Sequence, residues 1–174
     1  MTAPVLLSAD PVENDIVNTV TETDLLSYTV PANTLGTTHA LRVSISCDYL
    51  NNSAANRTFV LKIKYGSTTM YNDTSDVTSI LSSRRPVLID FFLFPKNATN
   101  SQGVAGNITV SAVGLATTGF GDLGTDEVLV QTPFVGANAA EDSTTSLALK
   151  VTITHSIADT NVSLRKVFST IEKM

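Results

Sequence analysis

Alternation of apolar and polar residues with a period of two constrains the fold of this chain more than any other feature. The clearest example is residues 41–50, where the odd positions from Leu41 to Tyr49 are apolar and the even positions include Arg42 and Asp48. Successive side chains of a β-strand point to opposite sides, so this pattern is typical of a strand with one buried face. No stretch of the sequence has the period of a long helix. The sequence therefore predicts an all-β protein.

Similar patterns, separated by polar or Gly-containing turns, recur along the chain. The expected strands are residues 24–30, 41–50, 57–65, 68–71, 86–94, 106–116, 145–155 and 161–171. Short strands without helices favour an antiparallel β-sandwich, jelly-roll-like, with about eight core strands. We expect residues 41–71 to form an antiparallel meander and residues 156–160 to join the last two strands as a hairpin loop. In the last strand, Val162, Leu164, Lys166 and Phe168 are expected to share one face.

The domain organisation is predicted to be simple. A chain of 174 residues suits one domain, here residues 21–174. Residues 1–20 contain Pro4 and Pro11, which disfavour a helix, so they are expected to form an extended arm or an extra edge strand. No apolar segment approaches the roughly 20 residues of a membrane helix. The first residues lack the basic and apolar regions of a signal peptide, so we expect synthesis in the cytoplasm and no membrane partner.

Two segments depart from the alternating pattern. Residues 86–94 (PVLIDFFLF) are apolar on both faces, which indicates a strand covered on both sides, by a neighbouring subunit or a loop. Asp90 within it is expected to be buried and paired with an arginine or a turn amide. Residues 117–142 are weakly patterned, with one possible strand at 127–131, and are interpreted as a long contact or binding loop.

The charge balance excludes one class of partner. Only 16% of residues are charged and the formal net charge is −5. Nucleic-acid affinity comes largely from Lys and Arg neutralising phosphates, so nucleic-acid binding is not expected. Ser, Thr and Asn replace much of the missing charge. A surface of such short side chains suits packing against neighbouring proteins, because few long side chains must be immobilised or desolvated.

The sequence contains few candidates for chemistry. His39 and His155 have no metal-ligand partner at local spacing, and Cys47, the only cysteine, is expected to be a small buried hydrophobe. Residues 119–127 resemble a calcium loop only loosely, because the Asp-x-Asp-x-Asp-Gly spacing is missing. There is no Gly-x-Ser-x-Gly nucleophile elbow. We therefore predict no catalytic residues, no cofactor-binding residues, no metal site and no enzymatic activity.

Several short motifs resemble one family of virus proteins. They are YTVPANTLGT at 28–37 followed by LRV at 41–43, DYLNNS at 48–53, NRT at 56–58, KIKYG at 62–66, VTITHS at 151–156 and SLRK at 163–166. Over roughly residues 20–172 the chain resembles β-sandwich virion proteins of tailed bacteriophages: capsid decoration (cement) proteins and head- or tail-fibre modules. The resemblance implies a jelly roll, usually trimeric, without enzyme activity. The first of these motifs, at 28–37, is typical of a structural turn and not of an active site. Pro31 ends a strand, and Gly36 supplies a permissive backbone dihedral.

These observations lead to one function prediction with an alternative. The chain is expected to be a capsid decoration protein on the virion surface, synthesised in the host cytoplasm and binding the major capsid protein as a homotrimer. Its contacts would come from residues 86–94, the N-terminal arm and the loop at 117–142. The alternative is a receptor- or glycan-binding fibre module, with exposed aromatic residues such as Phe120 or Phe134 stacking on sugars. A hydrolytic enzyme on the same sandwich is a third, distant reading that no residue supports.

Overall fold

The computed structural model describes residues 3–75, 80–113 and 127–174. These residues form eleven β-strands and no α-helix. The strands are β1 (Val5–Asp10), β2 (Asn14–Val17), β3 (Thr23–Val30), β4 (Leu41–Asn51), β5 (Phe59–Tyr65), β6 (Thr68–Thr74), β7 (Leu81–Ala98), β8 (Ser101–Val113), β9 (Glu127–Val135), β10 (Leu147–His155) and β11 (Val162–Lys173). Within the same ranges, no helix is long and apolar enough to cross a membrane.

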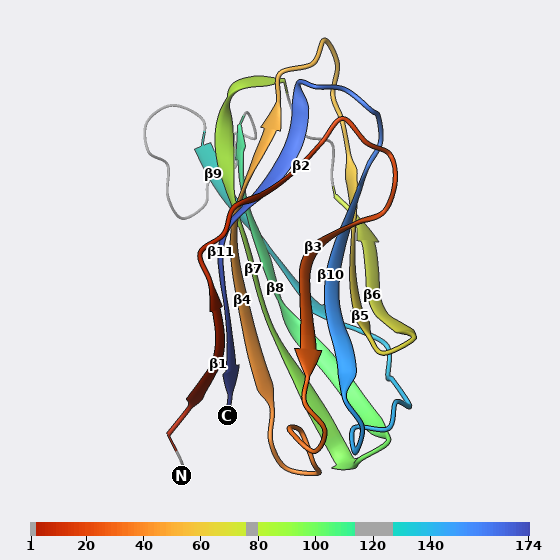
Figure 1. Ribbon diagram of the computed structural model, residues 1–174. Helices are drawn as coiled ribbons and strands as arrows, with labels where there is room; N and C mark the ends of the chain where they lie inside the picture. The colour runs from red at the N-terminus through yellow and green to blue at the C-terminus, as the bar shows by residue number, and fades with distance from the viewer. Residues whose placement is uncertain (1–2, 76–79, 114–126) are drawn as a thin grey trace.

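Two antiparallel sheets face each other (Figure 1). The seven-stranded sheet has the order β1-β11-β4-β7-β8-β9, and β2 also pairs with β11. The four-stranded sheet has the order β3-β10-β5-β6. The predicted all-β antiparallel sandwich is therefore confirmed. All eight expected strands are present, together with β1, β2 and β9.

The core lies between the sheets and follows from the alternation in the sequence. In β4 the side chains from Leu41 to Tyr49 at odd positions are at most 5% exposed, and they face the other sheet. In β5 and β10 the side chains of Phe59, Ile63, Val151 and their alternate neighbours meet them from the opposite side. Burial of this apolar area is the main force that holds the sheets together.

Strands that are neighbours in sequence mostly do not pair, which corrects two expectations. β4 and β5 lie in different sheets, so residues 41–71 do not form a meander; within this range, only β5 and β6 pair as a hairpin. Likewise, β10 and β11 lie in different sheets, so residues 156–161 cross the sandwich and are not a hairpin loop. Instead β10 lies between β3 and β5, and β11 lies between β1 and β4. This interleaving of early and late strands is jelly-roll-like.

The N-terminal arm forms the edge of the seven-stranded sheet beside β11. β1 pairs with the second half of β11 and β2 with its first half, both antiparallel. The arm therefore runs as one interrupted edge strand, and the residues between β1 and β2 lie opposite a bulge of β11 between Lys166 and Phe168. This bulge turns Phe168 away from the core: the side chain is 40% exposed and does not share the inward face predicted for it.

The segment at 117–142 is more regular than the sequence suggests. From Glu127 onward it forms β9 along β8, and Ala139 then exchanges backbone hydrogen bonds with Gln102. Residues 117–126 lie outside the described residues. The buried side chain of Gln102 donates to the carbonyl oxygens of Thr99 and Glu141, at 2.8 and 2.9 Å. This part of the segment is thus a fixed piece of the sandwich and not a free loop.

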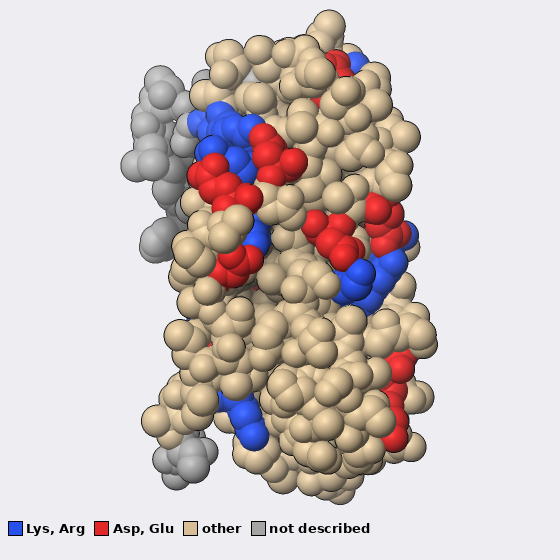
Figure 2. Space-filling model, in the orientation of Figure 1, with Lys and Arg blue, Asp and Glu red and all other residues tan. Residues whose placement is uncertain are grey.

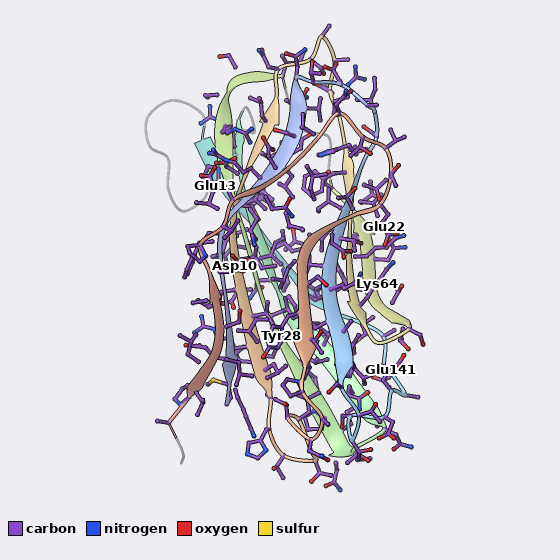
Figure 3. All side chains as sticks on the ribbon, in the orientation of Figure 1. Asp10, Glu13, Glu22, Tyr28, Lys64 and Glu141 are labelled. Carbon is purple, nitrogen blue, oxygen red and sulfur yellow. The ribbon has the colours of Figure 1, made fainter. Side chains whose placement is uncertain are left out.

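Glu141 joins the two sheets at one end of the molecule (Figure 3). Its carboxylate accepts hydrogen bonds from the Ser67 amide, the Ser67 hydroxyl and the Thr68 hydroxyl at 2.7–2.9 Å. Gly66, which begins the β5–β6 turn, has a φ of +58° and lies directly against the Glu141 side chain. The hydroxyl of Thr68, followed by the Ser67 donors, holds the pKa of Glu141 below its ordinary value. Gly36 also has a positive φ, of +54°, as its place in the predicted turn requires.

Candidate interaction surface

The outer face of the seven-stranded sheet carries exposed apolar side chains. In β7 the residues Val87, Ile89, Phe91 and Leu93 point into the core, whereas Leu88 and Phe92 point outward and are 43% and 40% exposed. Phe168 of β11 lies opposite Ser46 of β4, which in turn lies opposite Leu88. We call Leu88, Phe92 and Phe168 the outer apolar cluster. These three side chains, on one face of the sheet, are the candidate contact surface for another protein.

One ion pair lies in the middle of this cluster. Arg42 Nη2 is 3.1 Å from Asp90 Oδ2, and the Ser44 hydroxyl donates to Asp90 Oδ1 at 2.8 Å. The hydrogen bond to Asp90 and its charge raise the pKa of the Arg42 guanidinium. The predicted pairing of Asp90 with an arginine is confirmed. Its predicted burial is wrong: the side chain is 30% exposed because it belongs to the outward row of β7.

A second group of charges attaches the arm to the sheet (Figure 2, the mixed red and blue group on the left). Asp10 pairs with Lys166, Glu13 with Arg165 at 3.3 Å, and Asp15 with Arg84 at 3.1 Å. Each pair joins an arm carboxylate to a cation of β7 or β11; we call this group the arm clasp. Asp48 lies between Arg84 and Arg165, at 2.7 and 2.6 Å.

Lys166 is the most unusual member of the arm clasp. It is only 4% exposed, and its ammonium group pairs with Asp10. The hydrogen bond from Lys166 also lowers the pKa of Asp10. A buried ammonium group without a carboxylate partner is strongly unfavourable. Asp10, in the arm, therefore neutralises the charge of the buried Lys166.

The charges on the outer face of the four-stranded sheet are also compensated within the chain. Glu22 accepts hydrogen bonds from Lys62 at 2.6 Å, from Lys64, and from the Thr152 hydroxyl at 3.0 Å (Figure 3). Lys62 first, and then Lys64, hold the pKa of Glu22 down, at about 2. Lys150 pairs with Asp24 at 2.7 Å. Among the described residues, no large hydrophobic side chain of these four strands is exposed, whereas the other sheet exposes Leu88, Phe92 and Phe168.

The remaining candidates are dispersed over the fold. Cys47 is buried, and burial raises the pKa of its thiol to about 12, so it packs as a small hydrophobe. His39 lies in the loop between β3 and β4, whereas His155 is buried at the end of β10. Among the described residues, no three His, Cys, Asp or Glu side chains gather as metal ligands would. Within residues 119–127, only Glu127 is described, at the start of β9.

The structure describes only one of the two aromatic residues proposed to stack on sugars. Phe134 is 8% exposed, and its ring packs against Tyr71 with centroids 4.2 Å apart. It is therefore part of the core and not an exposed stacking platform, because its position in β9 points inward beside Gly106. Phe120 lies outside the described residues.

Comparisons with known proteins add little. No family model matches the chain, and no curated protein matches it. A solved structure, the CBM2 module of the evolved Dit protein of Lactobacillus casei BL23 phage J-1, covers 84% of this chain and 67% of its own chain. Its sequence identity is 14% and its TM-score is 0.36. At that TM-score the likeness supports no inference about function.

Proposed function

We propose that this chain is a structural virion protein, a capsid decoration protein that binds the major capsid lattice. The observation that carries the proposal is the outer apolar cluster, which gives the seven-stranded sheet a face suited to another protein. The sequence resemblance described above points to the same class of protein and implies a homotrimer. The proposed role is mechanical and includes no enzymatic step.

The geometry of the face supports a contact between folded proteins. Leu88, Phe92 and Phe168 supply apolar area that gains free energy when it leaves water. The charged groups beside them are already paired, because Arg42 lies 3.1 Å from Asp90 and 4.0 Å from Glu172, so docking desolvates paired charges and no isolated ion. Because β7 is paired on both sides, by β4 and β8, the face does not need to rearrange when a partner binds.

The copy number of the chain in purified particles tests the assignment. Quantitative mass spectrometry of the virus that encodes the chain would compare it with the major capsid protein. Hundreds of copies, in simple proportion to the capsid subunit, are expected for a decoration protein. A few to a few dozen copies would assign it to a fibre, spike or tail, and absence from the particle would refute a virion role.

A double substitution on the outer face tests the proposed contact surface. Leu88→Ser with Phe92→Ser should lower the affinity for capsids that lack the protein by at least about tenfold, about 1.4 kcal/mol. Val20→Ser, at an exposed position between β2 and β3, is the matched control and should bind as the unmodified chain does. Binding is measured by co-sedimentation over a concentration series. Equal affinity of the double variant and the control would contradict the assignment of this face.

A further inference from the structure

The N-terminal arm docks on the rest of the sandwich as a separate element. Among the described residues, both of its strands, β1 and β2, pair with β11 alone. The next strand, β3, belongs to the other sheet, and Figure 1 shows the chain leaving β2 and turning back into β3. We call the strands from β3 to β11 the body. A single short connection, between Val17 and Thr23, therefore joins the arm to the body.

This connection is held mainly by its own side chains. The Thr21 amide donates to the Thr19 hydroxyl oxygen, and the Thr23 hydroxyl donates to the Thr21 carbonyl oxygen, both at 3.0 Å. Among the described residues, no backbone–backbone hydrogen bond includes residues 18–21. Asn18 has a φ of +53°, a left-handed conformation that the turn requires and an extended chain does not. Opening the turn therefore costs only local contacts.

Glu22 fixes the end of the connection on the body. Its carboxylate accepts hydrogen bonds from Lys62 at 2.6 Å, from Lys64, and from the Thr152 hydroxyl at 3.0 Å, all on the four-stranded sheet. The part of the chain that can change direction without disturbing either sheet is thus limited to residues 18–21, which we call the hinge.

The body carries a built site for the arm. The three ion pairs of the arm clasp join carboxylates of the arm to cations of β7 and β11. Lys166 is only 4% exposed, so its charge needs a carboxylate partner whichever chain supplies it. The Ile16 side chain is buried, and its carbonyl oxygen lies 2.9 Å from His155 Nε2 of β10. The site therefore accepts one acidic, extended segment, and the arm of a second copy has the matching sequence.

The docked arm leaves apolar side chains in water. Val5, Leu6, Val12 and Val17 are 39–67% exposed, although the arm contacts the body along its whole length. An arm that crosses to a neighbouring copy lies between two bodies, where part of this apolar area can leave water. The docking contacts themselves are the same in both arrangements, so this burial and the relaxed hinge are the terms that favour crossing.

We propose that copies of this chain exchange their arms. The arm of each copy docks on β11 of a neighbour, and the hinge at residues 18–21 is extended between the two bodies. Exchange of an identical element is a low-cost route to an oligomer, because no new docking surface has to be built. This inference goes beyond the proposed capsid contact, which uses the outer face of the sheet, and it is tested without capsids.

The mass of the unmodified chain in solution is the first test. Light scattering over a series of micromolar concentrations should give particles of two or more chains. Monomers throughout the series would overturn the proposal, and this measurement needs no variant. Because no capsid is present, failure here would leave the proposed capsid contact untouched, and failure of capsid binding would leave this result untouched.

Cross-linking of two cysteine pairs shows which chain supplies the arm. Ala9 of β1 and Ser44 of β4 are the strand partners of Thr170 on its two sides. Ala9→Cys with Thr170→Cys therefore links the arm to the body, and Ser44→Cys with Thr170→Cys is the matched control within the body. A short bismaleimide reagent joins the thiols, and denaturing gel electrophoresis separates single from joined chains. Cys47 should not react, because it is buried and the pKa of its thiol is raised to about 12.

Exchange predicts a clear difference between the two pairs. The arm pair should give several-fold more covalently joined chains than the control pair, which should give single chains linked internally. Single chains from the arm pair would overturn the proposal even if the protein is an oligomer, since each arm would then dock on its own body. Equal amounts of joined chains from the two pairs would also overturn it, because random encounters would explain them.

Discussion

Replacing Gly106 by alanine is expected to lower the free energy of unfolding by about 3 kcal/mol, or to prevent folding. Gly106 lies in β8 opposite Phe91 of β7 and Phe134 of β9. A Cβ atom there would lie 2.5 Å from the Phe91 Cβ and closer still to the Asp90 carbonyl oxygen. These are backbone and Cβ atoms of a central strand, so they cannot move aside as the end of a flexible side chain can. Urea unfolding followed by circular dichroism measures the effect.

Gly36→Ala is the matched control for this prediction. Gly36 has a φ of +54°, but a Cβ atom there would meet no heavy atom within 4 Å. Its replacement should cost only the strain of a left-handed alanine, about 1 kcal/mol. Equal losses of unfolding free energy in the two variants would contradict this prediction. They would mean that a small shift of β7 and β8 makes room for the added Cβ atom.

Asp10→Asn is expected to destabilise the chain by about 2 kcal/mol, because it leaves the ammonium group of Lys166 buried without a negative partner. Lys166→Met removes the charge and keeps most of the side-chain volume. It should therefore change the stability by less than about 1 kcal/mol, or increase it. A large loss of stability in Asp10→Asn, with little or no loss in Lys166→Met, is what a buried charge predicts. Chemical denaturation of both variants at pH 7 measures the two changes in stability.

The double variant and the pH dependence complete this test. Asp10→Asn should no longer destabilise a chain that already carries Lys166→Met. The pKa of Asp10 is lowered, so the contribution of the pair is present above about pH 3.9 and is lost as the pH falls. The difference in stability between the unmodified chain and Asp10→Asn should accordingly shrink as the pH is lowered through and below about 3.9. A loss of about 2 kcal/mol of stability for Lys166→Met alone would show that the packing or charge of the lysine itself stabilises the fold. That result would contradict the interpretation that Asp10 only compensates an unfavourable buried charge.

Strand positions could be predicted from the sequence because they depend on local alternation. The odd residues of β4 and the alternate residues of β10 had to be buried whatever their partners were. The partners themselves could not be predicted in this way. β10 and β11 are separated by six residues, a length that suits either a hairpin or a crossing between sheets, and only the fit of the two inner faces decides.

Side-chain environments at irregular positions were harder to predict. Lys166 follows Val162 and Leu164 on the inward row of β11, and a charged residue in such a row was the available sign of a buried ion pair. Its partner Asp10 is 156 residues away, beyond any local pattern. Phe168 was assigned to the same row, but the bulge after Lys166 shifts the alternation by one residue. The outward position of Asp90 could be inferred only once the inward row of β7 was known.

The interleaved strand order has a consequence for folding during synthesis. β10 and β11 are translated after all the other strands, yet each occupies an interior position in its sheet. Until both have left the ribosome, β3 and β5 cannot be joined, and β4 has no partner on the side facing the arm. Nascent chains therefore hold unpaired strand edges for most of their synthesis, and the protein should fold slowly, in the manner of domains dominated by non-local pairing. A host that makes this chain at high level must keep many such incomplete sheets from pairing with one another.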